Sequence, residues 1–115
     1  TRFRKTGQPV IIGGSMETGS ALLVGQETGA ETFYSTCHGS GRTMSRMKAK
    51  QLVKGEQLQK DMLKRGIYVR TTSMSGLAEE AGAAYKNLPD VLESVEKAGI
   101  TKTVVTLLPV ANLKG

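Results

Sequence analysis

The apolar runs of this chain are short, and glycines end most of them. Residues 10–12 (VII) stop at a pair of glycines, and residues 21–24 (ALLV) lie between Gly19 and Gly25. Runs of three or four apolar residues bounded by glycine are typical of short buried strands. Any fold of this chain must therefore build its core from small pieces that tight turns connect.

The supply of core-forming side chains is thin for a chain of 115 residues. Aromatic residues make up 4% of it, tryptophan is absent, and 14 residues are glycine. Glycine loses more conformational entropy on folding than other residues and buries no side chain in return. A loop-rich small domain would have this composition. We favour the alternative that residues 1–115 are part of a larger domain and complete its core against sequence outside them.

Hydrophobic patterning predicts an α+β fold. Besides residues 10–12 and 21–24, we expect strands at residues 31–36, 67–71 and 101–108, which are rich in β-branched or aromatic side chains. We expect short mixed or antiparallel strands with helices packed against them. The tail, residues 109–115, is expected to be irregular.

Helix-forming residues dominate from residue 42 to 65, and we expect Gly55 to divide them into two helices. Residues 75–81 could add a single turn. A last helix is predicted between an N-cap at Asn87, supported by Asp90, and a C-terminal stop at Gly99. Its apolar face is made by Leu88, Val91, Leu92, Val95 and Ala98.

Positive charge gathers in the middle of the chain. The net charge is +6, and residues 32–55 contain no acidic residue. Four basic residues there are spaced four apart and would share one face of a continuous helix: Arg42, Arg46, Lys50 and Lys54. Most basic small proteins merely have solvated lysine faces, yet this local excess could attract phosphates in a salt-sensitive way.

The number of cysteines and the hydropathy of the chain indicate the cellular compartment in which we expect the protein. Cys37 is the only cysteine, so no disulfide forms within the chain, and a reducing compartment fits. No stretch approaches the roughly 18–20 apolar residues that a membrane-spanning helix needs. The basic residues among positions 1–5 have no apolar run behind them, so we do not expect a signal peptide. We expect a cytoplasmic protein without a membrane partner.

The densest chemistry lies in residues 37–42 (CHGSGR), which we expect directly after a strand and before a helix. Glycines let a backbone approach an anion, and a helix N-terminus adds free N–H groups. Arg42 offers a fork of donors that matches phosphate oxygens. His38 could act as base, metal ligand or nucleophile, because imidazole titrates near neutrality. From spacing alone, an ordinary strand-to-helix turn explains the segment equally well.

A second glycine-rich loop, residues 13–20 (GGSMETGS), also follows a predicted strand. Its small hydroxylated residues could cradle a phosphate or hydrogen-bond a base. Composition alone slightly favours a surface hairpin turn. Two such loops from neighbouring strands could form one nucleotide pocket, so their joint occurrence carries more weight than either loop alone.

No metal site is complete within this chain. Cys37 and His38 offer two ligands, whereas a closed tetrahedral site needs four. Adjacent residues on an extended chain point in different directions, so we expect Cys37 to pack against its neighbours.

Several of these residues form a recognisable series. Residues 14–16 (GSM), 36–42 (TCHGSGR) and 44–46 (MSR) follow one another in order, and residues 84–87 (AYKN) and 114–115 (KG) extend it. The series resembles the C-terminal signatures of RtcB-type RNA-splicing ligases and covers essentially the whole chain. The resemblance implies the C-terminal portion of the RtcB-like fold.

The resemblance also implies an activity. Members of this family join RNA ends that carry a 2′,3′-cyclic phosphate or 3′-phosphate to 5′-hydroxyl ends, as in tRNA splicing and RNA repair, and they use GTP and manganese. His38 would attack the α-phosphate of GTP and become guanylylated, after which GMP passes to the RNA 3′-phosphate. A neutral imidazole nucleophile and a glycine loop that admits phosphate fit this chemistry.

Site residues follow from the same resemblance. Arg42 and Arg46 would meet phosphates of the RNA or the nucleotide. Tyr85 would pack beside the guanine, and Lys114 would hydrogen-bond its edge. The remaining residues of the expected guanylate pocket are Gly13, Gly14, Ser15, Met16, Ser20, Gly39, Ser40 and Gly41.

The sequence departs from the family pattern at three positions. Gly13 stands where proline is common, Glu17 where glycine is common, and Ser40 where alanine is common. Glu17 would place a negative charge near a phosphate site, so it must point away or weaken binding. The family's manganese ligands lie N-terminal to the matched region, so we expect the N-terminal portion of the ligase as a partner.

Two other interpretations remain open: a basic RNA-binding module without catalysis, and an inactive remnant of a truncated ligase. The presence of His38, Arg42, Ser20 and Lys114 favours the ligase. Without the metal ligands, we expect the isolated chain to be inactive.

Overall fold

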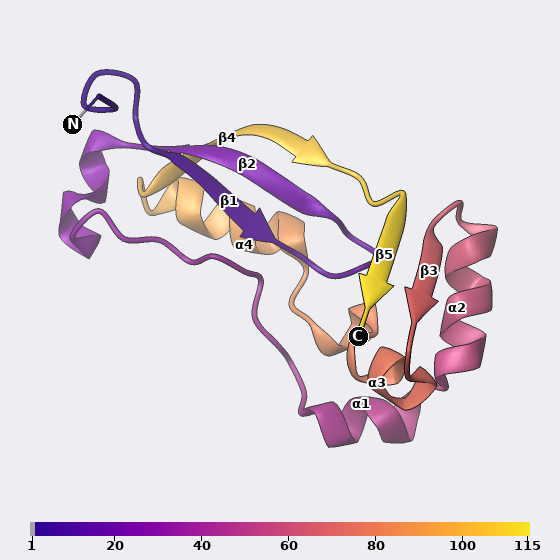
Figure 1. Ribbon diagram of the computed structural model, residues 1–115. Coiled ribbons are helices and arrows are strands. Elements are labelled where there is room, and N and C mark those ends of the chain that lie inside the picture. Colours follow the sequence, from indigo (N-terminus) through magenta and orange to yellow (C-terminus); the bar gives the residue numbers. More distant parts are fainter. Residues whose placement is uncertain (1) are drawn as a thin grey trace.

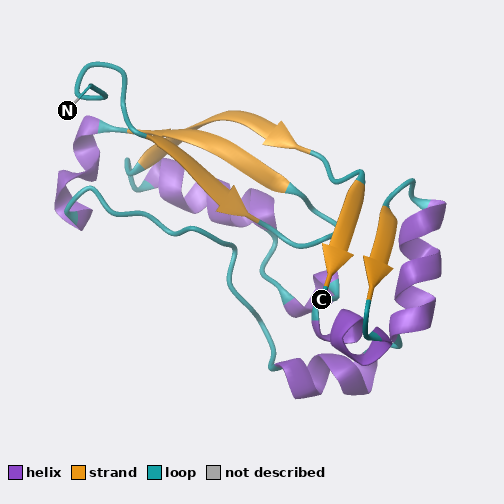
Figure 2. Cartoon of the chain, viewed as in Figure 1, coloured by secondary structure: helices purple, strands orange, loops and turns teal. Residues whose placement is uncertain are grey.

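The computed structural model describes residues 2–115 and contains both helices and strands, which confirms the predicted α+β class (Figure 2). Its elements, in chain order, are β1 (Pro9–Gly13), β2 (Ser20–Gly25), η1 (Glu27–Thr32), α1 (Arg46–Leu52), α2 (Gly55–Lys64), β3 (Tyr68–Thr71), α3 (Met74–Glu79), η2 (Gly82–Ala84), α4 (Leu88–Lys97), β4 (Thr101–Leu107) and β5 (Ala111–Lys114). No helix among these residues is long and apolar enough to cross a bilayer.

One half of the structure is an antiparallel sheet in the order β1-β2-β4, with α4 packed against one face (Figure 1). Ile12 pairs with Ala21 across β1 and β2, and both side chains are buried against α4. The remaining buried residues of this first core are Leu23, Leu88, Leu92 and Val95. The alternating pattern of β1 and β2 thus points one set of side chains toward the helix, as period two requires.

The other half is a parallel pair of strands, β3 and β5, covered by α2 and α3 (Figure 1). Tyr68 pairs with Ala111, and Thr71 pairs with Lys114. This second core contains Met16, Leu58, Met62, Ile67, Val69, Leu77 and Ala81. Because Met16 comes from the loop between β1 and β2, that loop connects the two cores of a molecule with extents of 47 × 25 × 21 Å.

The prediction of a strand at residues 31–36 is wrong. Residues 27–32 form the short helix η1, and Phe33 and Tyr34 both have left-handed backbone angles, with φ of 54° and 56°. The edge of β2 that does not face β1 is occupied by β4, so no sheet position is left beside β2. Strand propensity reflects fit to a neighbouring strand more than a backbone preference, and here that neighbour is missing.

The helical stretch forms two helices, as predicted, but the first begins at Arg46 and the division lies at residues 53–54. Helix α1 ends at Leu52, and Gly55 is the first residue of α2. A Cβ on Gly55 would lie 2.0 Å from the carbonyl oxygen of Met74, so this glycine permits close packing of α2 on α3. Arg42 precedes α1 and Lys54 is the N-cap of α2, so the expected continuous basic stripe does not form.

The tail also differs from the prediction, because residues 111–114 form β5 instead of an irregular end. Its partner β3 lies some forty residues earlier, and a pairing this distant leaves little local signal. The other expected elements are present, including strands over residues 10–12, 21–24, 67–71 and 101–108 with small shifts at their ends. Asn87 is the N-cap of α4, although its side chain makes no capping hydrogen bond, and Gly99 has a φ of +69°.

The two faces of the sheet give a matched test of the first core. Ile12 is fully buried against α4, whereas its neighbour Ile11 is 65% exposed on the opposite face. We expect Ile12→Ala to lower the free energy of unfolding by about 2–5 kcal/mol, through lost burial and the cavity left behind. Ile11→Ala should change it by less than about 1 kcal/mol. Chemical denaturation of both variants measures this, and equal losses would contradict the assigned faces.

Candidate functional site

Backbone hydrogen bonds join the two glycine-rich loops. The amide of Gly13 donates to the carbonyl oxygen of His38 at 3.0 Å, and the amide of Ser40 donates to the carbonyl oxygen of Gly13 at 2.8 Å. Gly13 and Gly39 therefore pair as a parallel bridge, although 26 positions separate them (39 − 13). The structure brings together the two loops that the sequence suggested as walls of one pocket.

A third segment, residues 82–86, pairs with the residues after His38. The amide of Lys86 donates to the carbonyl oxygen of Gly41 at 2.9 Å, and the amide of Thr43 donates to the carbonyl oxygen of Ala84 at 2.8 Å. Arg42 and Tyr85 lie opposite each other in this antiparallel bridge. Tyr85, which the resemblance places beside the guanine, is thus fixed close to the histidine segment.

His38 lies at the junction with an exposed side chain. Its surroundings differ from the expected strand-to-helix turn, because no strand precedes it and α1 begins only at Arg46, after the N-cap Ser45. Figure 2 shows the long loop that carries it between η1 and α1. Helix α1 therefore does not present its N-terminus to Gly39 and Gly41, whereas Asn87, the N-cap of α4, lines the same groove as these two glycines.

The first loop is a hairpin turn between β1 and β2, which is the interpretation its composition favoured. Its hydroxyls satisfy its own amides: Ser15 Oγ accepts from Glu17 and Thr18, each at 3.2 Å, and Thr18 Oγ1 accepts from Ser15 at 2.9 Å. Met16 buries its side chain in the second core, so only its backbone can face a nucleotide. Ser20 begins β2, where it pairs with Gly13. Gly14 donates to Gly19 within the turn.

Ser40 is 5% exposed, and its Oγ has no hydrogen-bond partner within residues 2–115. It lines a groove of about 650 Å³ between residues 37–43 and α4, together with Gly39, Gly41 and Cys37. Burying a hydroxyl without a partner costs about 1–3 kcal/mol. The Ser40 hydroxyl is therefore available to a group that enters this groove. Cys37 packs against the first core, as expected.

The guanidinium of Arg42 already has partners within the chain. It donates to the carbonyl oxygens of Met44 at 3.1 Å and Glu79 at 2.5 Å, and to the Tyr85 hydroxyl at 3.0 Å. Its central carbon also lies 4.8 Å from the centre of the Tyr85 ring. Arg42 is thus held in place by the structure, and these bonds use three of the five N–H groups of its guanidinium.

Glu79 forms ion pairs with two other basic residues of this region, Arg46 and Lys50. Its carboxylate lies 2.5 Å from Lys50 Nζ and 3.7 Å from Arg46 Nε, and the hydrogen bond from Lys50 lowers its pKa below the ordinary value. The side chain of Arg46 is 68% exposed, so it remains accessible to solvent. No local sequence pattern marks Glu79, because only tertiary packing brings α3 beside α1.

Lys114 lies on β5 and is half-buried. Its carbonyl oxygen accepts from the amide of Thr72 at 3.2 Å, and Asn112 on the same strand donates to the carbonyl oxygen of Met16 at 3.3 Å. Asn112, which the sequence analysis missed, therefore ties the C-terminal strand to the hairpin loop. Lys114 is held by a strand pairing and is not a mobile tail residue.

Glu17 points away from the histidine segment, one of the two outcomes expected for it. Its Oε1 accepts from Arg65 at 2.7 Å, and its Oε2 accepts from the amide of Gly82 at 2.5 Å. The charge is thus neutralised by an ion pair at the end of α2. Within residues 2–115 no cluster of three or more His, Cys, Asp or Glu side chains could hold a metal ion.

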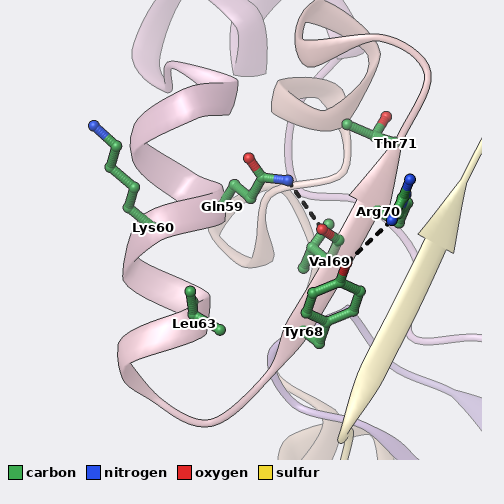
Figure 3. A pocket seen from close by; sticks show the side chains of 7 residues that line it. All are labelled: Gln59, Lys60, Leu63, Tyr68, Val69, Arg70 and Thr71. Atoms are coloured by element: carbon green, nitrogen blue, oxygen red, sulfur yellow. Dashed lines mark hydrogen bonds between the residues drawn. The ribbon is translucent and has the colours of Figure 1, made fainter.

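A second groove, of about 320 Å³, lies between α2 and β3 and is lined by none of the predicted site residues (Figure 3). There Gln59 donates to the carbonyl oxygen of Val69 at 2.9 Å, across the edge of β3 that does not face β5. Two cations, Lys60 and Arg70, border it. This groove is separate from the junction at His38.

The environment of Tyr85 predicts a change in titration. Burial raises the pKa of its hydroxyl, and the bond that this hydroxyl donates to Glu80 Oε2 at 2.5 Å raises it further. One of the three tyrosines should therefore ionise above the ordinary value of about 10. Because the unfolded state ionises first, stability should fall as pH rises past that value.

Ultraviolet absorbance of tyrosinate measures this titration. We expect the late component to be absent from Tyr85→Phe and present in Tyr68→Phe, a control on the half-exposed tyrosine of β3. A late component that survives Tyr85→Phe would contradict the assignment. The loss of stability at high pH should be smaller in Tyr85→Phe than in the unchanged chain.

Comparison with known proteins shows the family of this chain. The family model described as tRNA-splicing ligase RtcB matches residues 1–115. The tRNA-splicing ligase RtcB of Pyrococcus furiosus is 49% identical over 114 residues, which are 98% of this chain and 12% of the relative. The protein of the same name from Archaeoglobus fulgidus is 51% identical over 98% of this chain and 24% of its own length. RNA-splicing ligase RtcB homolog 2 of Entamoeba dispar is 46% identical over 98% of this chain and 22% of its own length.

The chain spans a quarter or less of the length of these relatives. Its match nevertheless runs from the first residue to the last and includes both glycine loops, His38, Tyr85 and Lys114. The chain belongs to the RtcB family of tRNA-splicing ligases.

Proposed function

We propose that this chain is the C-terminal, guanylate-accepting portion of a ligase that joins RNA 2′,3′-cyclic phosphate or 3′-phosphate ends to 5′-hydroxyl ends. It would act in tRNA splicing or RNA repair in the cytoplasm. The observation that supports this most directly is the pairing of Gly13 with Gly39, because it places both glycine loops beside the exposed His38.

In the proposed reaction, an imidazole nitrogen of His38 attacks the α-phosphorus of GTP and pyrophosphate leaves. The GMP moiety then moves from His38 to the RNA 3′-phosphate. The 5′-hydroxyl of the second RNA end attacks that activated phosphate, which forms the phosphodiester bond and releases GMP. Splitting one transfer into two through a covalent histidine intermediate is nucleophilic catalysis.

The guanylate would lie where the three segments meet. Gly13, Gly14, Ser15, Met16 and Ser20 would form one wall, and Gly39, Ser40 and Gly41 another. The buried hydroxyl of Ser40, which has no partner within residues 2–115, suits a nucleotide oxygen.

Two further residues would hold the guanine. Arg42 covers one face of the Tyr85 ring, so the base would pack on the opposite face or the edge of the ring. Lys114 would reach the base edge from β5, which Asn112 ties to the hairpin loop.

Arg46 would be the better placed of the two arginines to contact the RNA phosphate, because its side chain is 68% exposed and that of Arg42 is 21% exposed.

The described residues do not fit a manganese site, since no cluster of three ligands exists among them. We propose that the manganese ligands come from the N-terminal portion of the ligase, which would be the partner of this chain. The isolated chain would then be inactive.

Intact-mass measurement after incubation with GTP and manganese tests the proposal. The isolated chain should gain no GMP. A fusion in which this chain replaces the matched residues of the Archaeoglobus fulgidus relative should gain one GMP, and His38→Ala should abolish it. Glu93→Gln, which alters only an exposed ion pair on α4, should leave it unchanged.

An adduct on the isolated chain would overturn the argument from the missing metal ligands. A fusion that folds and binds RNA without forming the adduct would favour a non-catalytic RNA-binding module. A fusion that does neither would favour an inactive remnant of the ligase.

A further inference from the structure

We infer that Glu17 is a positioning residue of the guanylate site, because its carboxylate ties the hairpin loop to the segment that carries Tyr85. The inference rests on the proposed function, since it concerns how the same site is held in shape. Glu17 itself touches neither His38 nor the expected position of the nucleotide; it would act through Gly82 and the loop that contains Ser15.

Three chain segments surround the candidate site, and each pair of them is connected. Residues 13–20 and 38–43 are connected through the backbone of Gly13, and residues 38–43 and 82–86 through the backbones of Gly41 and Thr43. The third connection, between residues 13–20 and 82–86, is made by Glu17 Oε2, which accepts from the Gly82 amide at 2.5 Å. The Glu17 side chain thus completes an arrangement whose other two connections include backbone hydrogen bonds.

Both ends of this third connection continue into the site. The Glu17 amide donates to Ser15 Oγ at 3.2 Å, within the loop expected to hold the guanylate. The Gly82 carbonyl oxygen accepts from the Tyr85 amide at 3.1 Å. A displacement of Glu17 would therefore break the connection between residues 13–20, which form one wall of the expected pocket, and the turn of residues 82–85, which orients Tyr85.

The charge and fit of Glu17 show that this contact is specific. Its side chain is 23% exposed, and Arg65 compensates its charge with a hydrogen bond of 2.7 Å. At position 82 an added Cβ would lie 2.1 Å from Glu17 Oε2 and 2.8 Å from its carboxyl carbon. A methyl group at position 82 would therefore displace the Glu17 carboxylate from its observed position at the amide.

The test measures His38 guanylylation in the fusion protein described above, with KM for GTP and the maximal rate determined separately. Loss of a hydrogen bond to a charged group weakens binding by about tenfold or more. We expect Glu17→Ala to raise KM for GTP by about tenfold with little change in the maximal rate, as for a loss of uniform binding. Glu17→Gln can still accept from Gly82 and should raise KM less.

A double-mutant cycle separates positioning from general stability. Gly82→Ala should displace the carboxylate and raise KM as Glu17→Ala does. The double variant, Glu17→Ala with Gly82→Ala, should be no worse than either single variant, because both remove one contact. Glu93→Gln, on an exposed ion pair, is the control and should leave KM unchanged.

The extent of adduct formation at saturating GTP reports the fraction of active protein. An unchanged KM in Glu17→Ala, with only this fraction reduced, would make Glu17 a structural residue and overturn the inference. Additive effects in the double variant would also overturn it. If Glu17→Ala fails to fold, Glu17→Gln decides by the same readout. An unchanged fusion without any adduct would overturn the proposed function instead.

Discussion

Two backbone hydrogen bonds between Gly13 and the residues on either side of Gly39 hold the candidate site together. The loop between η1 and α1 has no regular secondary structure, so these bonds give His38 a fixed place beside the β1–β2 hairpin. A Cβ at position 13 or 39 would meet its nearest atom at 3.8 or 3.6 Å, an ordinary contact. The pairing therefore depends on the backbone and not on the small size of these two glycines.

The hairpin loop of residues 13–20 connects the two hydrophobic cores of the molecule. Its neighbour Ile12 lies in the first core, while Met16 lies in the second. Asn112 and Arg65 attach β5 and α2 to the same loop. A loop anchored from several directions keeps its shape without a ligand, and this preorganisation lowers the cost of binding a nucleotide. The sheet face that does not contact α4 is covered by no other element among residues 2–115, and Ile11, Val105 and Leu107 are exposed there.

Local pattern predicted those elements whose signal lies within the element itself. Most of the apolar face of α4, the glycine-bounded strands β1 and β2, and the stop at Gly99 follow from periodicity and backbone preference. Ala98, predicted on that face, is instead the exposed C-cap of α4. The predictions at residues 31–36 and 109–115 were wrong for a shared reason. Whether a segment forms a strand depends on the partner it meets in the fold: residues 111–114 pair with β3, whereas residues 31–36 pair with no strand in the described part of the chain.

The sequence by itself determined which residues could do chemistry: a histidine in the second of two glycine-rich loops, and a series of motifs that identifies the RtcB family. Only the tertiary structure decided how those residues are held. It turned Glu17 toward Arg65 and Gly82, placed Arg42 over Tyr85, and moved the start of α1 away from His38. The physical reason is that motifs are local, whereas charge pairs and strand partners join residues far apart in the chain, and their choice depends on packing that no single segment encodes.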